Sequence, residues 1–287
     1  MGTIAVVGAS GNIGSRVAAS LASGGKQVRA ITRTPNAGPE GVEVHAADLT
    51  NLDEAVAALE GASAVYLTPP EGGDDPEGLE LSVSNNVIEA ATKHGIDHVV
   101  MHTAVNADRG DTGARVLDNK TTIEQALADS GLGYTILRPA WFMQNLWAAR
   151  DYLQNGVVSL PWDGDMVWAA TDINDIVGAA IRFLDQGPAN RGFDIHVPGG
   201  ITGNQIAAAA STVLGHEVAY QPAGVSTQDY CESFPFSKPH REMYAELFDY
   251  FISTTYLGDP QPITEALPGF KIRGLEDFLR QELFAGN

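Results

Sequence analysis

The sequence predicts an α/β fold in which a doubly wound parallel sheet is followed by a smaller, mixed α/β C-terminal domain. Strand-like and helix-like segments alternate through the first 140 residues, a pattern typical of right-handed βαβ units. A glycine-rich turn joins the first strand to the first helix. After residue 150 the hydrophobic periodicity loosens, which indicates a different architecture in the second half.

The first elements follow from short apolar or β-branched runs that are bounded by glycine or proline. Apolar residues at helical spacing predict the connecting helices, which end at Gly24-Gly25 and at Gly61. Strands are predicted over residues 3–7, 27–32, 42–46 and 63–67, and helices over residues 12–23 and 52–59.

The later elements are predicted from the same patterns, with two short strand candidates within residues 156–170. Further helices are expected over 79–94, 120–127, 173–184, 202–214, 239–252 and 274–284, and strands over 98–102, 134–137 and 193–197. We expect one domain over residues 1–150 and a second over 151–287. The helix at 173–184 and the strand at 193–197 are expected to return to the first domain.

Composition excludes several classes of protein. The 287 residues are 44% hydrophobic and 18% charged, so the chain can bury a large core. Its formal charge of -19 repels nucleic-acid phosphates and anionic lipid headgroups. No run approaches the ~20 apolar residues of a membrane span. The single cysteine, Cys231, and histidines without metal-ligand spacing predict neither a disulfide nor a metal site. We expect a cytoplasmic protein, and its oligomeric state stays open.

The strongest motif is GASGNIG at residues 8–14, which directly follows a predicted strand and opens a predicted helix. Its glycines suit a tight turn, a close approach of the backbone to a phosphate, and close packing of helix on strand. The helix N-terminus supplies N–H groups and partial positive charge to a pyrophosphate. The motif predicts a Rossmann-type dinucleotide site, and the alternative is a glycine-rich turn that is only structural.

Two residues at strand ends bear on the choice of cofactor. The second strand ends in TRTP without the Asp or Glu that binds the ribose 2′-hydroxyl of NAD, and it carries Arg33 instead. Arginine suits a 2′-phosphate, so NADP(H) is predicted; the alternative is a solvated loop arginine. Asp48 follows the third strand, where it either meets an adenine amino group or serves as a turn or cap residue.

Two further features point to the carboxyl edge of the sheet. Lys120 shares a helical face with Ile123 and Leu127, which favours a cleft-facing lysine over one that snorkels to solvent. The run LRPAWFMQN at residues 137–145 follows a strand and therefore lies where ligands bind in open α/β sheets. Its aromatic and sulfur side chains suit an apolar pocket wall, or are ordinary core.

Together these segments resemble the NmrA-like group of atypical short-chain dehydrogenases/reductases. The resemblance covers about residues 1–200, and the C-terminal third matches only in architecture. It is carried by GASGNIG, by TRTP around Arg33, by AADL around Asp48, by VYLTPP at 65–70, by HTAV at 102–105, by Lys120, by SGLGYTILRPAWFMQN at 130–145 and by TDINDIVGAAI at 171–181.

The resemblance implies an NADP-binding Rossmann domain and a C-terminal domain that binds a small-molecule substrate. It places the pyrophosphate, the 2′-phosphate and the adenine on the first three strands, and the nicotinamide on the later ones. The implied cofactor residues are Gly8, Ser10, Gly11, Asn12 and Ile13 for the pyrophosphate, Arg33 for the 2′-phosphate, Asp48 and Leu49 for the adenine, Thr68 and Pro69 for the ribose edge, and Thr103, Lys120, Ala140, Trp141, Phe142 and Met143 for the nicotinamide side.

The chain departs from the YxxxK pattern that is typical of short-chain dehydrogenases, because Val116 stands four residues before Lys120. NmrA-like proteins that lack this tyrosine are either redox sensors or reductases of quinones, dyes and conjugated imines. We expect a reductase of an electron-poor conjugated molecule, with His102, Thr103 or water delivering a proton. Candidate substrate residues are Trp141, Phe142, Trp162, Phe234 and Phe236.

Two other functions compete with this interpretation. A non-catalytic NADP(H) sensor that binds a partner protein agrees with the missing tyrosine, although it needs neither Lys120 nor the aromatic run after Pro139. A cofactor-retaining isomerase or epimerase would need an acid/base pair beside the nicotinamide, and the sequence offers none there.

Overall fold

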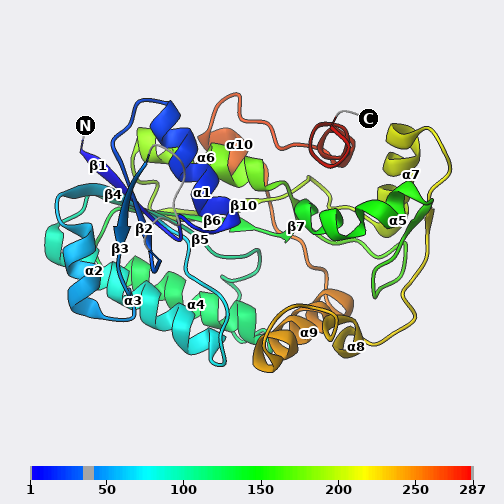
Figure 1. Cartoon of the computed structure of the whole chain (residues 1–287), viewed down its shortest axis with the longest axis horizontal. Helices are drawn as coiled ribbons and strands as arrows, with labels where there is room; N and C mark the ends of the chain where they lie inside the picture. The colour runs from blue at the N-terminus through cyan, green and yellow to red at the C-terminus, as the bar shows by residue number, and fades with distance from the viewer. Residues whose placement is uncertain (1, 35–41, 286–287) are drawn as a thin grey trace.

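The computed structural model describes residues 2–34 and 42–285, and its centre is a seven-stranded parallel sheet (Figure 1). The strand order is β10-β6-β5-β4-β1-β2-β3, so the order reverses between β1 and β4, where open α/β sheets bind ligands. The predicted fold class is confirmed. The strands are β1 (Thr3–Val7), β2 (Val28–Thr32), β3 (Glu43–Ala46), β4 (Ala62–Leu67), β5 (His98–His102), β6 (Tyr134–Pro139) and β10 (Arg191–Ile195).

Helices cover both faces of the sheet, as Figure 1 shows. One face packs against α1 (Asn12–Ser23) and α6 (Ile173–Gln186). The other packs against α2 (Leu52–Leu59), α3 (Pro76–His94) and α4 (Arg115–Asp129). Because both faces are buried, the central strands are almost entirely apolar.

The second half of the chain packs around a further core at Trp168, Ile206 and Phe251, to which Val105 and Leu117 of the first half also belong. Two pairs of very short parallel strands run through it. Its elements are β7 (Trp141–Phe142), the 3-10 helix η1 (Met143–Ala149), α5 (Arg150–Gln154), β8 (Val157–Val158), β9 (Ala170–Thr171), α7 (Gly203–Leu214), β11 (Ala219–Tyr220), α8 (Thr227–Cys231), α9 (Lys238–Ser253), α11 (Leu275–Phe278) and the π-helical turn η2 (Leu279–Leu283).

Two later segments lie with the first half. Helix α6 packs on α1, and β10 pairs with β6 at the edge of the sheet. The short helix α10 (Gln261–Ala266) contributes Ile263 to the core between the sheet and α1–α6. Among the described residues, no helix is both long and apolar enough to cross a bilayer.

Several predicted boundaries need correction. Helix α4 begins at Arg115 rather than at residue 120, because Asp118 in its first turn accepts hydrogen bonds from the backbone N–H groups of Thr112 and Gly113. The strand predicted at 193–197 is β10, which starts and ends two residues earlier, in register with β6. The segment predicted as one helix over 274–284 is α11 followed by η2.

Candidate functional site

The glycine turn after β1 is shaped for close backbone contact. Gly8 has a φ of 77°, and a Cβ there would lie 2.6 Å from the carbonyl oxygen of Thr68. A Cβ on Gly14 would lie 2.3 Å from the carbonyl oxygen of Gly8, so only glycine lets α1 pack this close to β1. Helix α1 starts after Gly11 without a side-chain cap, which leaves its first N–H groups available to an anion. The turn therefore fits a pyrophosphate.

The other predicted residues of this turn differ in exposure. Ser10 and Asn12 are exposed, whereas the side chain of Ile13 belongs to the core between the sheet and α1. Ile13 can therefore meet a ligand only through its backbone.

Arg33 and Asp48 are both exposed, past the ends of β2 and β3, and the charge of Arg33 reaches the carboxylate of Asp48. Asp48 accepts hydrogen bonds from the backbone N–H (3.0 Å) and the hydroxyl (2.7 Å) of Thr50. These bonds, with a smaller contribution from Arg33, hold the pKa of Asp48 below its ordinary value. Asp48 thus serves as a turn residue through Thr50, and its charged carboxylate also faces the positive charge of Arg33. Leu49 is buried, and its carbonyl accepts a hydrogen bond from Asn86.

Lys120 is a buried lysine that lies between the buried carboxylate of Glu80 and the exposed carboxylate of Glu71. Its Nζ lies 2.9 Å from Oε1 of Glu71 and 2.6 Å from Oε1 of Glu80, and its side chain is 7% exposed. Burial disfavours the charge on Lys120, but the two carboxylates more than offset this and hold its pKa above the ordinary value. The alternative of a lysine that snorkels to solvent is therefore wrong.

The carboxylate of Glu71 also contacts helix α9. Its Oε2 accepts a hydrogen bond from the hydroxyl of Tyr244 (3.0 Å) and lies 3.9 Å from Nε2 of His240. The Lys120 ammonium holds the pKa of Glu71 well below its usual range. The sequence reasoning missed Glu71, Glu80 and Tyr244. The available signal was the acid-rich stretch EGGDDPEGLE at residues 71–80, which directly follows the predicted strand end.

His102 ends β5 with its imidazole turned toward β4. Its Nδ1 lies 3.1 Å from the hydroxyl of Tyr66 and 3.3 Å from that of Thr68. Burial lowers the pKa of His102 to about 4, and the positive charge of Lys120 adds to this effect. His102 is therefore neutral at neutral pH, so it is a hydrogen-bond partner rather than a charged acid.

Thr103 points to the opposite face of the sheet. Its hydroxyl donates a hydrogen bond to Oε1 of Glu124 (2.5 Å), and Glu124 forms an ion pair with Arg138. This bond commits the Thr103 hydroxyl to α4, so proton delivery by Thr103 stays a prediction. Val116, four residues before Lys120, is a buried apolar residue of α4.

Most of the predicted substrate residues belong to one connected aromatic cluster. The ring of Phe248 joins Trp162 (5.4 Å) to Phe234 (6.2 Å), and Phe234 contacts Phe236 (5.8 Å). Trp141 joins the cluster through Trp168, which lies 6.0 Å from Trp141 and 5.0 Å from Trp162.

Two predicted residues stand apart in exposure or position. Phe142 packs into the core between the sheet and α1–α6, away from the aromatic cluster. Phe236 is 38% exposed and stacks on His240 at 4.5 Å. Phe236 therefore brings the cluster to the surface beside the charges around Lys120.

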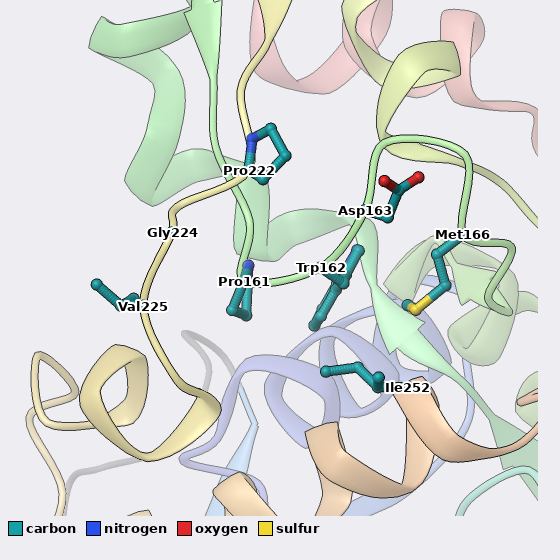
Figure 2. A pocket seen from close by; sticks show the side chains of 8 residues that line it. All are labelled: Pro161, Trp162, Asp163, Met166, Pro222, Gly224, Val225 and Ile252. Carbon is teal, nitrogen blue, oxygen red and sulfur yellow. The ribbon is translucent and has the colours of Figure 1, made fainter.

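A cavity of about 460 Å³ lies in the second half, with Trp162 of the aromatic cluster in its wall (Figure 2). Ile252 on its wall follows Tyr244 by about two turns of α9, or ~12 Å. The cavity is therefore distinct from the Lys120 end of the helix. Its walls are Pro161, Trp162, Asp163, Met166, Pro222, Gly224, Val225 and Ile252.

Comparisons with known sequences find reductases among the relatives of this chain. The chain is 30% identical to NAD(P)H azoreductase of Xenophilus azovorans over 224 residues, and the matched region covers 76% of each chain. It is 29% identical over 227 residues to Quinone oxidoreductase 2 of Escherichia coli K12, across 76% of this chain and 77% of that protein.

Solved structures show the same fold. The Escherichia coli NADPH-dependent quinone oxidoreductase QOR2, complexed with NADPH, superposes with a TM-score of 0.79 at 26% identity, over 96% of this chain and 97% of that one. A nucleoside-diphosphate-sugar epimerase of Staphylococcus aureus reaches a TM-score of 0.82 at 21% identity, over 97% and 99%, and supports the fold alone. The profile of the NmrA-like family matches residues 1–279, and the chain therefore belongs to the NmrA-like family.

Proposed function

We propose that this protein is an NADPH-dependent reductase that transfers a hydride to an electron-poor conjugated or aromatic small molecule, such as a quinone, dye or imine. The single observation that carries the proposal is the uncapped glycine turn from Gly8 to Gly14, whose shape fits a pyrophosphate. Support comes from relatives named as NAD(P)H azoreductase and quinone oxidoreductase, and from QOR2, which was crystallised with NADPH.

The cofactor would lie along the carboxyl edge of the sheet. We assign the pyrophosphate to the backbone of the turn after β1, and the 2′-phosphate to Arg33. The adenine would lie beside Asp48 and Leu49, and the ribose edge of the cofactor beside Thr68 and Pro69, since Thr68 directly follows β4. The surface charge of -19 opposes a polyanionic cofactor, so the positive charge of Arg33 matters more for binding.

On the nicotinamide side we assign the backbone of residues 140–143, the ammonium of Lys120 and the neutral imidazole of His102. When bound, NADPH supplies the hydride. Lys120 stays protonated because of its two carboxylates, so it acts as a fixed cationic donor. It has no tyrosine beside it to activate, because Val116 occupies that position.

The absence of this tyrosine favours acceptors that delocalise the added electrons. A simple ketone develops an alkoxide that needs a strong acid, whereas a conjugated acceptor spreads the charge over its π system. We assign the flat face of such a molecule to the aromatic cluster of Trp141, Trp162, Phe234 and Phe236. Phe236 is the most exposed of these and the nearest to the Lys120 charges, through its stack on His240. Phe142 would serve only from the cofactor side.

The test is NADPH consumption by the purified protein with a panel of quinones, azo dyes, triarylmethane dyes and cyclic imines. We expect turnover with at least one class, and slow turnover with simple ketones. Fast and general ketone reduction would show that another residue replaces the missing tyrosine.

A second candidate is a non-catalytic NADP(H)-sensing regulator that binds a partner protein. The observation that favours it is the buried, apolar Val116 at the tyrosine position. Tight NADPH binding with no turnover on any member of the panel would favour this sensor over the reductase.

A further inference from the structure

The direction of the Lys120 ammonium depends on two carboxylates. A lysine ammonium has three N–H donors, and Lys120 gives two of them to Glu71 (2.9 Å) and Glu80 (2.6 Å). These two bonds together fix where the third N–H points. Any ligand contact of Lys120 is therefore set by the positions of both carboxylates.

Glu80 is held by the helices α3 and α4, which cover one face of the central sheet. It lies on α3 with its side chain 5% exposed, and its second oxygen accepts a hydrogen bond from Asn119 of α4 at 2.6 Å. This half of the Lys120 support does not involve the C-terminal half of the chain.

Glu71 is held from the other side. It lies on the loop after β4 and is followed by Gly72 and Gly73, whose φ angles of 133° and 76° only glycine adopts readily. The loop is fastened to helix α9 by two bonds: the Tyr244 hydroxyl donates to Glu71, and the Ser237 hydroxyl donates to the carbonyl of Gly73. The position of Glu71 therefore follows the position of α9.

We propose that Glu71 is a positioning residue, which couples the placement of helix α9 to the direction of the Lys120 ammonium. The inference rests on the proposed function for the ligand that Lys120 meets. Helix α9 also carries part of the aromatic cluster assigned to the acceptor. An acceptor that binds with α9 in its present position would thus leave Lys120 aligned for the hydride transfer. An acceptor that displaces α9 would misalign Lys120.

Two variants cut this coupling at different points. Tyr244→Phe removes the hydrogen bond from α9 to Glu71 and leaves the Glu71–Lys120 ion pair, together with the 3.9 Å contact of His240 and the Ser237 bond. Glu71→Ala removes the contacts of this carboxylate with both α9 and Lys120. We expect kcat to fall about 5- to 20-fold in each, because misalignment of a positioning group acts mainly on the transition state. The Kd for NADPH should change less than about 2-fold, because Lys120 keeps its charge and its bond to Glu80. Glu71→Gln should recover most of kcat, since an amide can accept from Lys120 and donate to Tyr244.

The matched control is Glu246→Ala. Glu246 also joins α9 to the start of α4, through an ion pair with Arg115 at 2.9 Å, but it forms no ion pair with Lys120. Its loss leaves the Tyr244–Glu71 and Ser237–Gly73 bonds in place, so α9 keeps its hold on Glu71 and kcat should stay unchanged. Circular dichroism and thermal unfolding check the folding of all variants.

The outcomes separate this role from the proposed function. Wild-type turnover with a loss of kcat in Tyr244→Phe and Glu71→Ala, but not in Glu246→Ala, supports the role. Wild-type turnover with unchanged kcat in folded Tyr244→Phe, or an equal loss in Glu246→Ala, overturns it and leaves the reductase intact. A wild-type protein that neither binds nor oxidises NADPH overturns the proposed function, and this role with it.

Discussion

The ammonium of Lys120 and the carboxylate of Glu80 form a buried ion pair, with 2.6 Å between Nζ and Oε1 and side chains that are 7% and 5% exposed. Removing one partner of a buried pair leaves the other charge uncompensated, which costs about 3–5 kcal/mol. A residue assigned to the cofactor therefore also holds α3 to α4, and its mutation must be interpreted with that in mind.

The first prediction concerns this pair. Lys120→Met should lower the free energy of unfolding by about 3–5 kcal/mol, because it leaves two carboxylates without their cation. Adding Glu80→Gln should restore part of that loss by removing one of the two charges. Urea unfolding of the single and double variants measures both effects. A single variant as stable as wild type, or a double variant that is less stable than the single one, would contradict the buried-pair account.

The second prediction concerns Gly14. A Cβ at this position would lie 2.3 Å from the carbonyl oxygen of Gly8, so Gly14→Ala should destabilise the fold by about 1–3 kcal/mol and weaken NADPH binding. Gly24→Ala at the other end of α1 is the matched control, because its Cβ would meet only atoms at 3.4 Å. Thermal unfolding and cofactor titration compare the two variants. Equal behaviour of the two would mean that the turn does not need its glycine.

The third prediction is a dependence of stability on pH that comes from Asp175. Burial, together with the nearby charge of Asp172, raises the pKa of Asp175 to about 7, although the backbone N–H of Arg273 opposes this. An unfolded aspartate has a pKa near 3.9. Between these values the native state holds a proton that the unfolded state lacks. The free energy of unfolding should therefore fall as pH rises from about 4 to about 7, and this contribution stays level above.

Asp175→Asn should remove this dependence, and at pH 8 the variant should be at least as stable as wild type. Exposed Asp53 gives the control, because Asp53→Asn should keep the wild-type slope. Urea unfolding across the pH range measures the slopes. A variant that keeps the wild-type slope would show that another group is responsible.

The fourth prediction concerns cofactor choice. Arg33→Ala should weaken NADPH binding about 5- to 150-fold and change NADH binding little, because only NADPH carries the 2′-phosphate. Arg29 on β2 donates to the carbonyls of Ala58 and Glu60, so Arg29→Ala should not discriminate between the two cofactors. Titrations at fixed ionic strength measure this, since salt screens the contact. If Arg33→Ala weakens the binding of NADPH and NADH equally, Arg33 does not bind the 2′-phosphate.

The sequence predicted the sheet well because its strands are continuous apolar runs, such as Thr3–Val7 and His98–His102, whose ends coincide with the predicted ones. The short elements η1, α5 and α8 were missed, because a segment of about one or two turns carries too little periodicity. The glycine turn was predictable for the same reason, because its signal lies in consecutive residues, GASGNIG at 8–14.

The surroundings of Lys120 were not predictable in this way. Its partners Glu71 and Glu80 lie 49 and 40 residues earlier in the chain, and Tyr244 comes from the opposite half. Local spacing indicated an inward-facing lysine but carries no information on which distant side chains meet it. The same holds for Thr103, whose partner Glu124 is set by how α4 packs on the sheet.

The most direct test of the central claim uses NADPH that carries deuterium at the transferable position of the nicotinamide. A cationic triarylmethane dye is the best acceptor, because its central carbon takes up a hydride as a stable C–H bond and needs no proton. The account predicts that the protein bleaches the dye and that the colourless product carries one deuterium from one of the two C4-labelled forms of NADPH. The contrary result is an NADPH-bound protein that does not bleach the dye and does not reduce any quinone, azo dye or imine.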